Sequence, residues 1–280
     1  MKKEIDVWLQ LGGKPTTEEV LFAKEFLNLP DSMYFLAAIN GDPIGGTAIY
    51  RDRTRLAMTL VAARLQEEYR DNTPLQLFKA SLPFFKTLSI RDVDVLTEDS
   101  TERSEIPFPL STKLQSWARP ALANMGFEEV AKVAEISLDD IAKTKDEHPI
   151  PADRLPNHEA ARKLLWDQRK EIGLSCSPLW LALDMANARG TLQTYSDQNE
   201  LCMAIGVEKL NQWNIITFFV TNPEVLATSM AVKLLLNHLS ENRTTFSLVG
   251  EGQIEVVKSA SKLCESILKV NELTLHRKLL

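Results

Sequence analysis

The chain has 280 residues, of which 44% are hydrophobic and 25% are charged, as is usual for a globular protein. Its formal net charge of −6 disfavours a protein that binds nucleic acid by electrostatic attraction. The three cysteines and four histidines show no metal-ligand spacing, and no apolar run is long enough to cross a membrane. We therefore expect reduced thiols, no metal, no membrane or nucleic-acid partner, and a cytoplasmic location.

The first half of the chain alternates helices and strands. Thr16, followed by two glutamates, indicates a helix start, Gly41-Asp42 a hairpin turn, and Gly126 a helix stop. The elements predicted in chain order are a strand over Lys3–Leu11, a helix over Thr16–Asn28, strands over Met33–Asn40, Pro43–Tyr50 and Thr54–Leu65, a helix over Thr73–Leu88, a strand over Asp92–Leu96, a helix over Lys113–Met125 and a strand over Val130–Ile136. A turn is also expected at Arg51-Asp52-Arg53.

The second half follows a charged stretch that holds three prolines, Pro149, Pro151 and Pro156. This composition is typical of a linker between domains. The elements predicted after it are helices over His158–Ile172 and Ser177–Asn187, strands over Thr191–Tyr195, Leu201–Lys209 and Trp213–Val220, a helix after Thr228, a strand over Thr244–Val249, a helix over Gln253–Ile267 and a strand over Glu272–Lys278.

One local pattern occurs in both halves. An apolar strand, a polar turn and a helix follow one another within Asn214–Leu239, and the same order links the strand that ends at Leu65 to the helix that begins at Thr73. The first turn of a helix has unpaired backbone N–H groups, so each unit is suited to hold an anion. An ordinary strand-to-helix connection is the alternative. The recurrence predicts two domains, 1–140 and 157–280, joined by a linker over 141–156.

The order of elements in each half resembles that of the GNAT (acyl-CoA N-acyltransferase) superfamily. Short local matches support the resemblance, and they are Glu67-Glu68-Tyr69-Arg70, Asn124-Met125-Gly126-Phe127, Asn222-Pro223-Glu224 and Lys262-Leu263-Cys264-Glu265. The resemblance implies a mixed α/β fold of the α+β type. It would consist of two GNAT-like domains, each with a mixed, mostly antiparallel twisted sheet flanked by helices.

The family binds the pyrophosphate of CoA with a loop of the pattern R/Q-x-x-G-x-G/A. In the first half Arg70 is kept, but Thr73 and Leu75 replace the glycines and Pro74 removes a donor. In the second half the cation is lost, while Ser229 and Ala231 stay small. A structural relic is the alternative for either loop. The candidate CoA-binding residues implied by the resemblance are Leu65, Arg70, Asp71, Asn72, Thr73, Leu75, Thr221, Thr228, Ser229, Met230 and Ala231.

The family often places a tyrosine in its last helix to protonate the leaving thiolate. Leu122 and Cys264 stand at that position in the two halves. Leucine donates no proton, whereas the thiol of Cys264 is a candidate acid, a buried structural thiol being the alternative. The candidate bases after the central strands are Glu67, Glu68, Glu98, Asp99 and Glu251, each of which also fits a solvated turn.

The resemblance implies an enzyme that transfers an acyl group from acetyl-CoA, or another acyl-CoA, to an amine. The acceptor would be a small-molecule or peptide amine, and a homodimer is possible. Acyl transfer depends chiefly on positioning the amine against the thioester and on an oxyanion donor from the strand backbone. The alternative is a degenerate GNAT fold that acts as a binding or scaffold protein without acyl transfer.

Overall fold

A computed structural model of the chain describes residues 2–11, 14–52, 56–87, 89–100, 104–142, 151–170, 177–197, 200–211, 213–240 and 243–280. The chain forms two compact units. Unit 1 comprises Met1–Ala131, Cys176–Leu181 and Leu273–Leu280, and unit 2 comprises Lys132–Ser175 and Ala182–Glu272. No helix in the described ranges has the length and apolarity that a membrane span requires.

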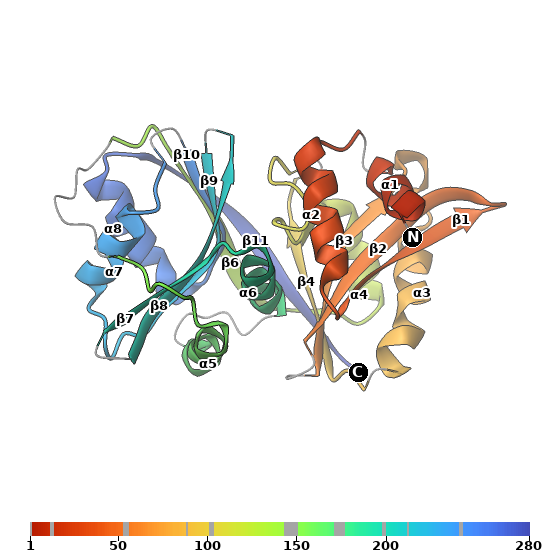
Figure 1. Ribbon diagram of the computed structural model, residues 1–280. Helices are drawn as coiled ribbons and strands as arrows, with labels where there is room; N and C mark the ends of the chain where they lie inside the picture. Colours follow the sequence, from red (N-terminus) through yellow and green to blue (C-terminus); the bar gives the residue numbers. More distant parts are fainter. Residues whose placement is uncertain are drawn as a thin grey trace. The chain divides into compact units, whose positions relative to one another are not determined.

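Unit 1 is a mixed sheet between two pairs of helices (Figure 1). Its elements are α1 (Lys2–Gln10), α2 (Thr17–Asn28), β1 (Ser32–Ile39), β2 (Asp42–Asp52), β3 (Ala57–Leu65), α3 (Pro74–Thr87), β4 (Asp92–Glu98), β5 (Lys113–Leu114) and α4 (Arg119–Asn124). The strand order is β1-β2-β3-β4-β11, in which the last strand is the end of β11 (Ile267–Leu279). Helices α1 and α2 cover one face, and α3 and α4 cover the other. The pair β3–β4 is parallel, whereas β1–β2, β2–β3 and β4–β11 are antiparallel.

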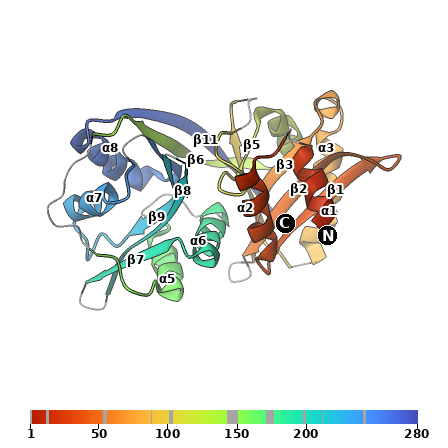
Figure 2. The ribbon, with the colours of Figure 1, turned by 45° about the horizontal axis from the view of Figure 1, so that its top comes forward.

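Unit 2 has the same kind of architecture (Figure 2). Its elements are β6 (Glu128–Asp139), α5 (His158–Gln168), α6 (Ser177–Arg189), β7 (Leu192–Asp197), β8 (Glu200–Leu210), β9 (Trp213–Thr221), α7 (Thr228–Leu236), β10 (Arg243–Val249) and α8 (Ile254–Leu263). The strand order is β11-β6-β10-β9-β8-β7, and β9–β10 is the parallel pair. Helices α5 and α6 lie on one face of the sheet, and α7 and α8 on the other.

The predicted fold class is confirmed, since helices flank mixed and mostly antiparallel strands. Each half of the chain runs through two helices, a three-strand meander, a helix, a strand, a helix and a strand, and the first half has the additional short strand β5 before α4. The two final strands are exchanged, because most of β6 belongs to unit 2 and the end of β11 belongs to unit 1. The two compact units therefore differ from the two halves of the sequence. The predicted domains 1–140 and 157–280 and the linker 141–156 stay a prediction.

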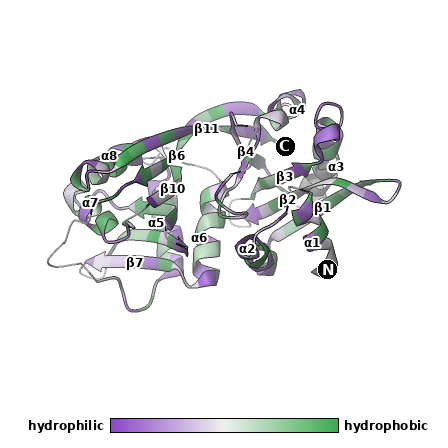
Figure 3. Ribbon diagram, turned by 90° about the horizontal axis from the view of Figure 1, so that it is seen from above, coloured by the Kyte–Doolittle hydropathy of each residue, from purple (hydrophilic) through white to green (hydrophobic). Residues whose placement is uncertain are grey.

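Several residues that signal a cap, a turn or a helix end in the sequence have that role in the structure. The Thr16 side chain accepts a hydrogen bond from the amide of Glu19 (3.1 Å) and so caps α2. Asn40 and Gly41 turn the β1–β2 hairpin with φ values of 55° and 92°, and Figure 3 shows its hydrophilic tip. Gly126 ends α4 with a φ of 78°.

Three predicted elements are wrong in type or extent. Lys3–Leu11 was predicted as a strand, but it forms α1, and the buried or half-buried Val7, Trp8 and Leu11 have the i, i+1, i+4 spacing of one helix face. The predicted helix over Lys113–Met125 begins as strand β5. The helix predicted over Gln253–Ile267 stops at Leu263, where the chain reverses through Glu265 (φ 51°), and β11 begins at Ile267.

Some predictions fall on residues outside the description. These are the end of the predicted turn at Arg53, the start of the strand at Thr54, the end of the helix at Leu88, residues 143–150 of the linker, the end of the helix at Ile172, and Cys176. The turn prediction is wrong for Arg51 and Asp52, because both residues belong to β2 and pair with β3.

Candidate functional site

The centre of unit 1 is the point at which β3 and β4 stop pairing. Their parallel register runs from Ala57 opposite Asp92 to Leu60 opposite Val95. Val61 has no partner in the register between β2 and β3, so β3 carries a bulge there. A bulge bends its strand, which explains why β3 continues to Leu65 without pairing with β4.

Arg70 lies in the turn that joins the end of β3 to the start of α3. Its Nε donates a hydrogen bond to the carbonyl oxygen of Leu65 (3.3 Å), which holds the guanidinium against the strand end. The amide of Thr73 is hydrogen-bonded to the carbonyl of Tyr69 (3.0 Å), and α3 begins at Pro74. The other predicted residues of this turn are Glu67, Glu68, Asp71 and Asn72, which are exposed, and Leu75, which is half-buried.

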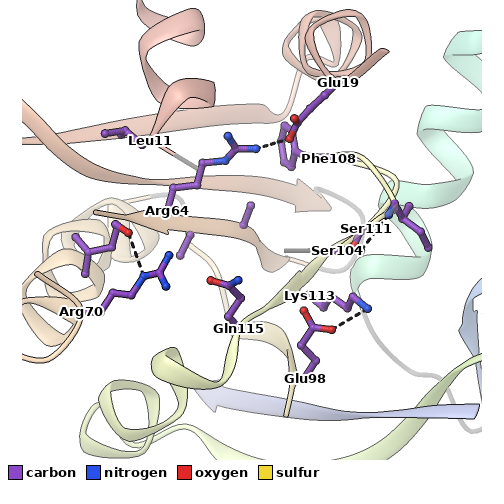
Figure 4. A pocket seen from close by; sticks show the side chains of 14 residues that line it. Leu11, Glu19, Arg64, Arg70, Glu98, Ser104, Phe108, Ser111, Lys113 and Gln115 are labelled. Carbon is purple, nitrogen blue, oxygen red and sulfur yellow. Dashed lines mark hydrogen bonds and ion pairs between the residues drawn. The ribbon is translucent and has the colours of Figure 1, made fainter. Parts of the chain in front are cut away.

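A pocket of about 240 Å³ opens beside this turn (Figure 4). Two ion pairs line it, Arg64 with Glu19 (2.5 Å) and Lys113 with Glu98 (2.8 Å). Both carboxylates are buried, so each is neutralised by its cation. The complete lining consists of Leu11, Glu19, Ala62, Ala63, Arg64, Leu65, Arg70, Glu98, Ser104, Ile106, Phe108, Ser111, Lys113 and Gln115.

A second cavity, of about 400 Å³, lies at the start of α3 and against α4. Its lining consists of Arg70, Asp71, Asn72, Pro74, Leu75, Gln76, Trp117, Pro120, Ala121 and Asn124. Arg70 lines both cavities. The structure thus brings four predicted residues of the first half, Arg70, Asp71, Asn72 and Leu75, to one cavity, and three, Leu65, Arg70 and Glu98, to the other.

In unit 2, β9 and β10 pair from Trp213 opposite Arg243 to Ile216 opposite Phe246. Past that point the buried side chain of Gln253 accepts a hydrogen bond from the amide of Gly250 (3.1 Å) and donates one to the carbonyl of Phe219. A single carboxamide therefore satisfies backbone groups of both separating strands.

The predicted residues of the second half surround the start of α7. The turn before it is held by Asn222, whose side chain accepts a hydrogen bond from the amide of Glu224 (3.1 Å). No side chain caps α7, which begins at Thr228. Thr228, Ser229 and Met230 are exposed, Thr221 is half-buried and Ala231 is buried. The base candidate Glu251 is exposed, in a 3₁₀ turn after β10.

The two positions at which the family often keeps its acid are in the hydrophobic cores. Leu122 is fully buried in the cluster beneath α3 and α4. Cys264 is buried in the cluster of unit 2, and its thiol donates a hydrogen bond to the carbonyl of Ser261 (3.6 Å). Asp99 is exposed and pairs with Arg119. The catalytic and CoA-binding roles of the predicted residues stay predictions.

Sequence reasoning missed Arg64, Lys113 and Gln253. Arg64 occupies an ordinary strand position, and its guanidinium lies 4.4 Å from the centre of the Trp8 ring on a different element. Lys113 was assigned to a helix. Gln253 was assigned to the first position of a helix, and no sequence signal indicates that it bridges two strands. Within the described residues, no three His, Cys, Asp or Glu side chains are grouped to hold a metal ion.

No protein-family model and no curated protein matches the sequence. Solved structures do resemble the structure of this chain. A putative acetyltransferase from Pyrococcus horikoshii is 11% identical over 100% of this chain and 87% of its own, with a TM-score of 0.65. A tandem GNAT protein from the clavulanic acid biosynthesis pathway is 12% identical over 99% of this chain and 95% of its own, with a TM-score of 0.57.

A third similar structure is a GCN5-related glucosamine N-acetyltransferase region in a fungal multi-domain β-N-acetylglucosaminidase. It is 10% identical over 99% of this chain, with a TM-score of 0.64, and this chain spans 37% of that protein. All three resemblances extend over essentially the whole chain, although the sequence identity is low. The fold of this chain is therefore that of the GNAT superfamily.

Proposed function

We propose that the chain is an N-acyltransferase that binds an acyl-CoA in unit 1 and transfers the acyl group to an amine. The observation that carries the proposal is the position of Arg70, which lines both cavities in the turn before α3. The GNAT fold supports acyl transfer as the reaction class. Acetyl-CoA is the first donor to test, and a small-molecule or peptide amine is the proposed acceptor.

The larger cavity suits the CoA end of the donor. Arg70 uses Nε for the carbonyl of Leu65, and its two terminal nitrogens remain to donate to phosphate oxygens. Backbone amides at the start of α3 would add to this attraction, as at other helix N-termini. Asp71, Asn72, Thr73 and Leu75 would frame the phosphates in place of the usual glycines.

The smaller pocket suits the acceptor. An ammonium group must lose a proton before its nitrogen attacks the thioester carbon, and Glu98 is the carboxylate of this pocket that we assign as the base. The carbon–sulfur bond then breaks as the amide forms. The leaving thiolate would take its proton from water, because Leu122 has no proton to donate and the thiol of Cys264 is buried in the core of unit 2. We therefore expect slow transfer to generic amines.

A binding or scaffold protein without acyl transfer is the second candidate. Two observations favour it. Glu98 is already neutralised by Lys113 at 2.8 Å, which weakens it as a base. The exposed carboxylates of Glu67, Glu68 and Asp71 surround Arg70 in sequence and oppose a phosphate group. This candidate predicts binding of a ligand without turnover.

The test is acetyl-CoA binding measured by calorimetry, together with thiol release in the presence of a panel of amines. Arg70→Ala should weaken binding roughly ten- to a hundredfold, because a charge-assisted hydrogen bond contributes about 1.5–3 kcal/mol. The matched control is Arg91→Ala, which removes an exposed arginine of unit 1 that lines neither cavity. Ser229→Trp at the start of α7 tests unit 2 in the same way. Absence of binding at millimolar acetyl-CoA would refute the proposal.

We also propose that the chain is a tandem repeat of two GNAT-like domains. The repeated order of elements and the parallel pair in each unit support this. A cytoplasmic location is a further proposal, supported by the unpaired, buried thiols of Cys202 and Cys264. Homodimer formation stays a prediction that sedimentation or light scattering can test.

A further inference from the structure

The space between β3 and β4, beyond the end of their pairing, is filled by the chain itself. Leu96 and Thr97, the residues of β4 that follow its last partner in β3, pair with Lys113 and Leu114 of β5 instead. Strand β5 also lies against β3. A third strand therefore stands between the two separating strands, beside the pocket that contains Arg70.

This short strand is anchored from several sides. Lys113 is 5% exposed and its ammonium lies 2.8 Å from the carboxylate of Glu98. Leu114 is 1% exposed and belongs to the core cluster beneath α3 and α4. Earlier in the same segment, the ring of Phe108 packs edge-on against Trp8 (5.0 Å between centroids) and Phe26 (5.2 Å). We call residues 104–115 the inserted segment.

Unit 2 shows that the architecture does not require such a strand. There the connection from β10 to α8 is one 3₁₀ turn, and the separating strands are bridged by the side chain of Gln253. In unit 1 the corresponding connection runs from the end of β4 at Glu98 to α4 at Arg119 and contains the inserted segment. The longer connection thus brings an additional strand to the centre of the candidate site.

We propose that β5, near the end of the inserted segment, is a built-in plug, which an acyl donor displaces when it binds between β3 and β4, while the preceding residues of the segment stay in place as the lining of the pocket. The inference rests on the proposed function, because it takes the donor to be an acyl-CoA held at Arg70. The thioester end must reach the strand backbone at the point where β3 and β4 separate, and Lys113 and Leu114 now occupy that backbone on the β4 side.

The plug has a measurable consequence for affinity. When only a fraction of molecules is competent to bind, the apparent dissociation constant equals the intrinsic one divided by that fraction. A substitution that loosens β5 increases the competent fraction, so it should tighten donor binding although it removes native contacts. A destabilising substitution elsewhere in the same core is not expected to tighten donor binding.

The experiment compares acetyl-CoA binding by calorimetry in the full-length wild type, Leu114→Ala and Phe108→Ala. Met58→Ala is the matched control, since Met58 is fully buried in the same cluster but lies where β3 and β4 still pair. We expect roughly tenfold or tighter binding for Leu114→Ala, because minor states are typically populated at about 0.1–10%. Hydrogen exchange at Lys113–Gln115 should become faster when acetyl-CoA is added to the wild type.

The outcomes separate the plug from the proposed function. Binding that is equal or weaker in Leu114→Ala than in the wild type, with unchanged exchange at β5, overturns the plug and leaves acyl-CoA binding intact. If no variant binds, although hydrogen exchange shows β5 detached in Leu114→Ala, the donor assignment has failed and the plug has lost its role. Binding that is tighter in Leu114→Ala than in the wild type, with exchange at β5 that acetyl-CoA accelerates, would support both.

Discussion

Arg277 donates two hydrogen bonds to the carboxylate of Asp94, from Nε (2.7 Å) and from a terminal nitrogen (3.1 Å), across 183 residues of sequence. Asp94 is fully buried on β4 and also accepts a hydrogen bond from the amide of Ser177 (2.8 Å). The bidentate pair fixes the end of β11 beside β4. The last strand of the chain is thereby part of the core of unit 1.

Loss of this pair should destabilise unit 1 strongly. Arg277→Met leaves the buried carboxylate of Asp94 without its cation, which typically costs about 3–5 kcal/mol. Urea unfolding curves measure the loss. Arg91→Met, which removes an exposed arginine of the same unit, should change stability by less than about 0.5 kcal/mol. Similar effects for the two variants would contradict the role of the pair.

Gly46 should be irreplaceable for packing reasons. A Cβ atom added there would lie 2.5 Å from Cδ1 of Trp8 and even closer to the carbonyl oxygen of Phe35. Backbone cannot yield as a flexible side chain does, so Gly46→Ala should cost about 3 kcal/mol in thermal or urea unfolding. The control is Gly190→Asn, because φ is 70° there, a value that asparagine tolerates, and a Cβ would meet no atom within 4 Å. A neutral Gly46→Ala would contradict the close approach of β1 and Trp8 to Gly46.

The sequence predicted the order of strands and helices because its signals are local. Thr16, Gly41 and Gly126 each act within a few residues and form the cap, turn and stop that their types favour. The strand β5 could not be predicted, since its two residues are extended only because β4 offers a free edge at Leu96 and Thr97.

The candidate site likewise has a part that the sequence predicts and a part that it does not. Arg70 could be predicted because it precedes a helix, whereas the ion pairs of Arg64 and Lys113 join elements distant in sequence. The exchange of β6 and β11 between the units likewise depends on tertiary pairing, which no local pattern encodes.

Cys264 should be unreactive and dispensable for chemistry. Its side chain is 1% exposed, and its hydrogen bond goes to the carbonyl of Ser261 within unit 2. Cys264→Ala should leave any acyl transfer unchanged and cost about 1–2 kcal/mol of stability through the small cavity that it creates. Labelling with a thiol-reactive reagent should show that Cys264 reacts only after unfolding. A native thiol that reacts quickly, or activity lost in Cys264→Ala with normal acetyl-CoA binding, would restore the thiol as the acid.

The buried pair of Tyr195 and His238 makes unit 2 sensitive to acid. The phenol oxygen lies 2.7 Å from Nε2 of the imidazole, so the two side chains share a buried hydrogen bond. Burial lowers the pKa of His238 to about 4 and, together with the nearby carboxylate of Asp153, raises the pKa of Tyr195 to about 12. Both shifts favour the uncharged forms.

The stability of the protein should therefore fall as the pH falls from about 6.5 to about 4. In that window the unfolded chain binds a proton at His238 that the folded chain does not, so the contribution is complete above pH 6.5 and is lost toward pH 4. The shift corresponds to at most about 3 kcal/mol, at 1.36 kcal/mol per pKa unit. Urea unfolding at a series of pH values measures it.

His238→Gln should remove this part of the slope. Tyr195→Phe should retain it, because burial, and not the phenol, depresses the pKa of His238. A slope that disappears in Tyr195→Phe would assign the effect to the hydrogen bond instead.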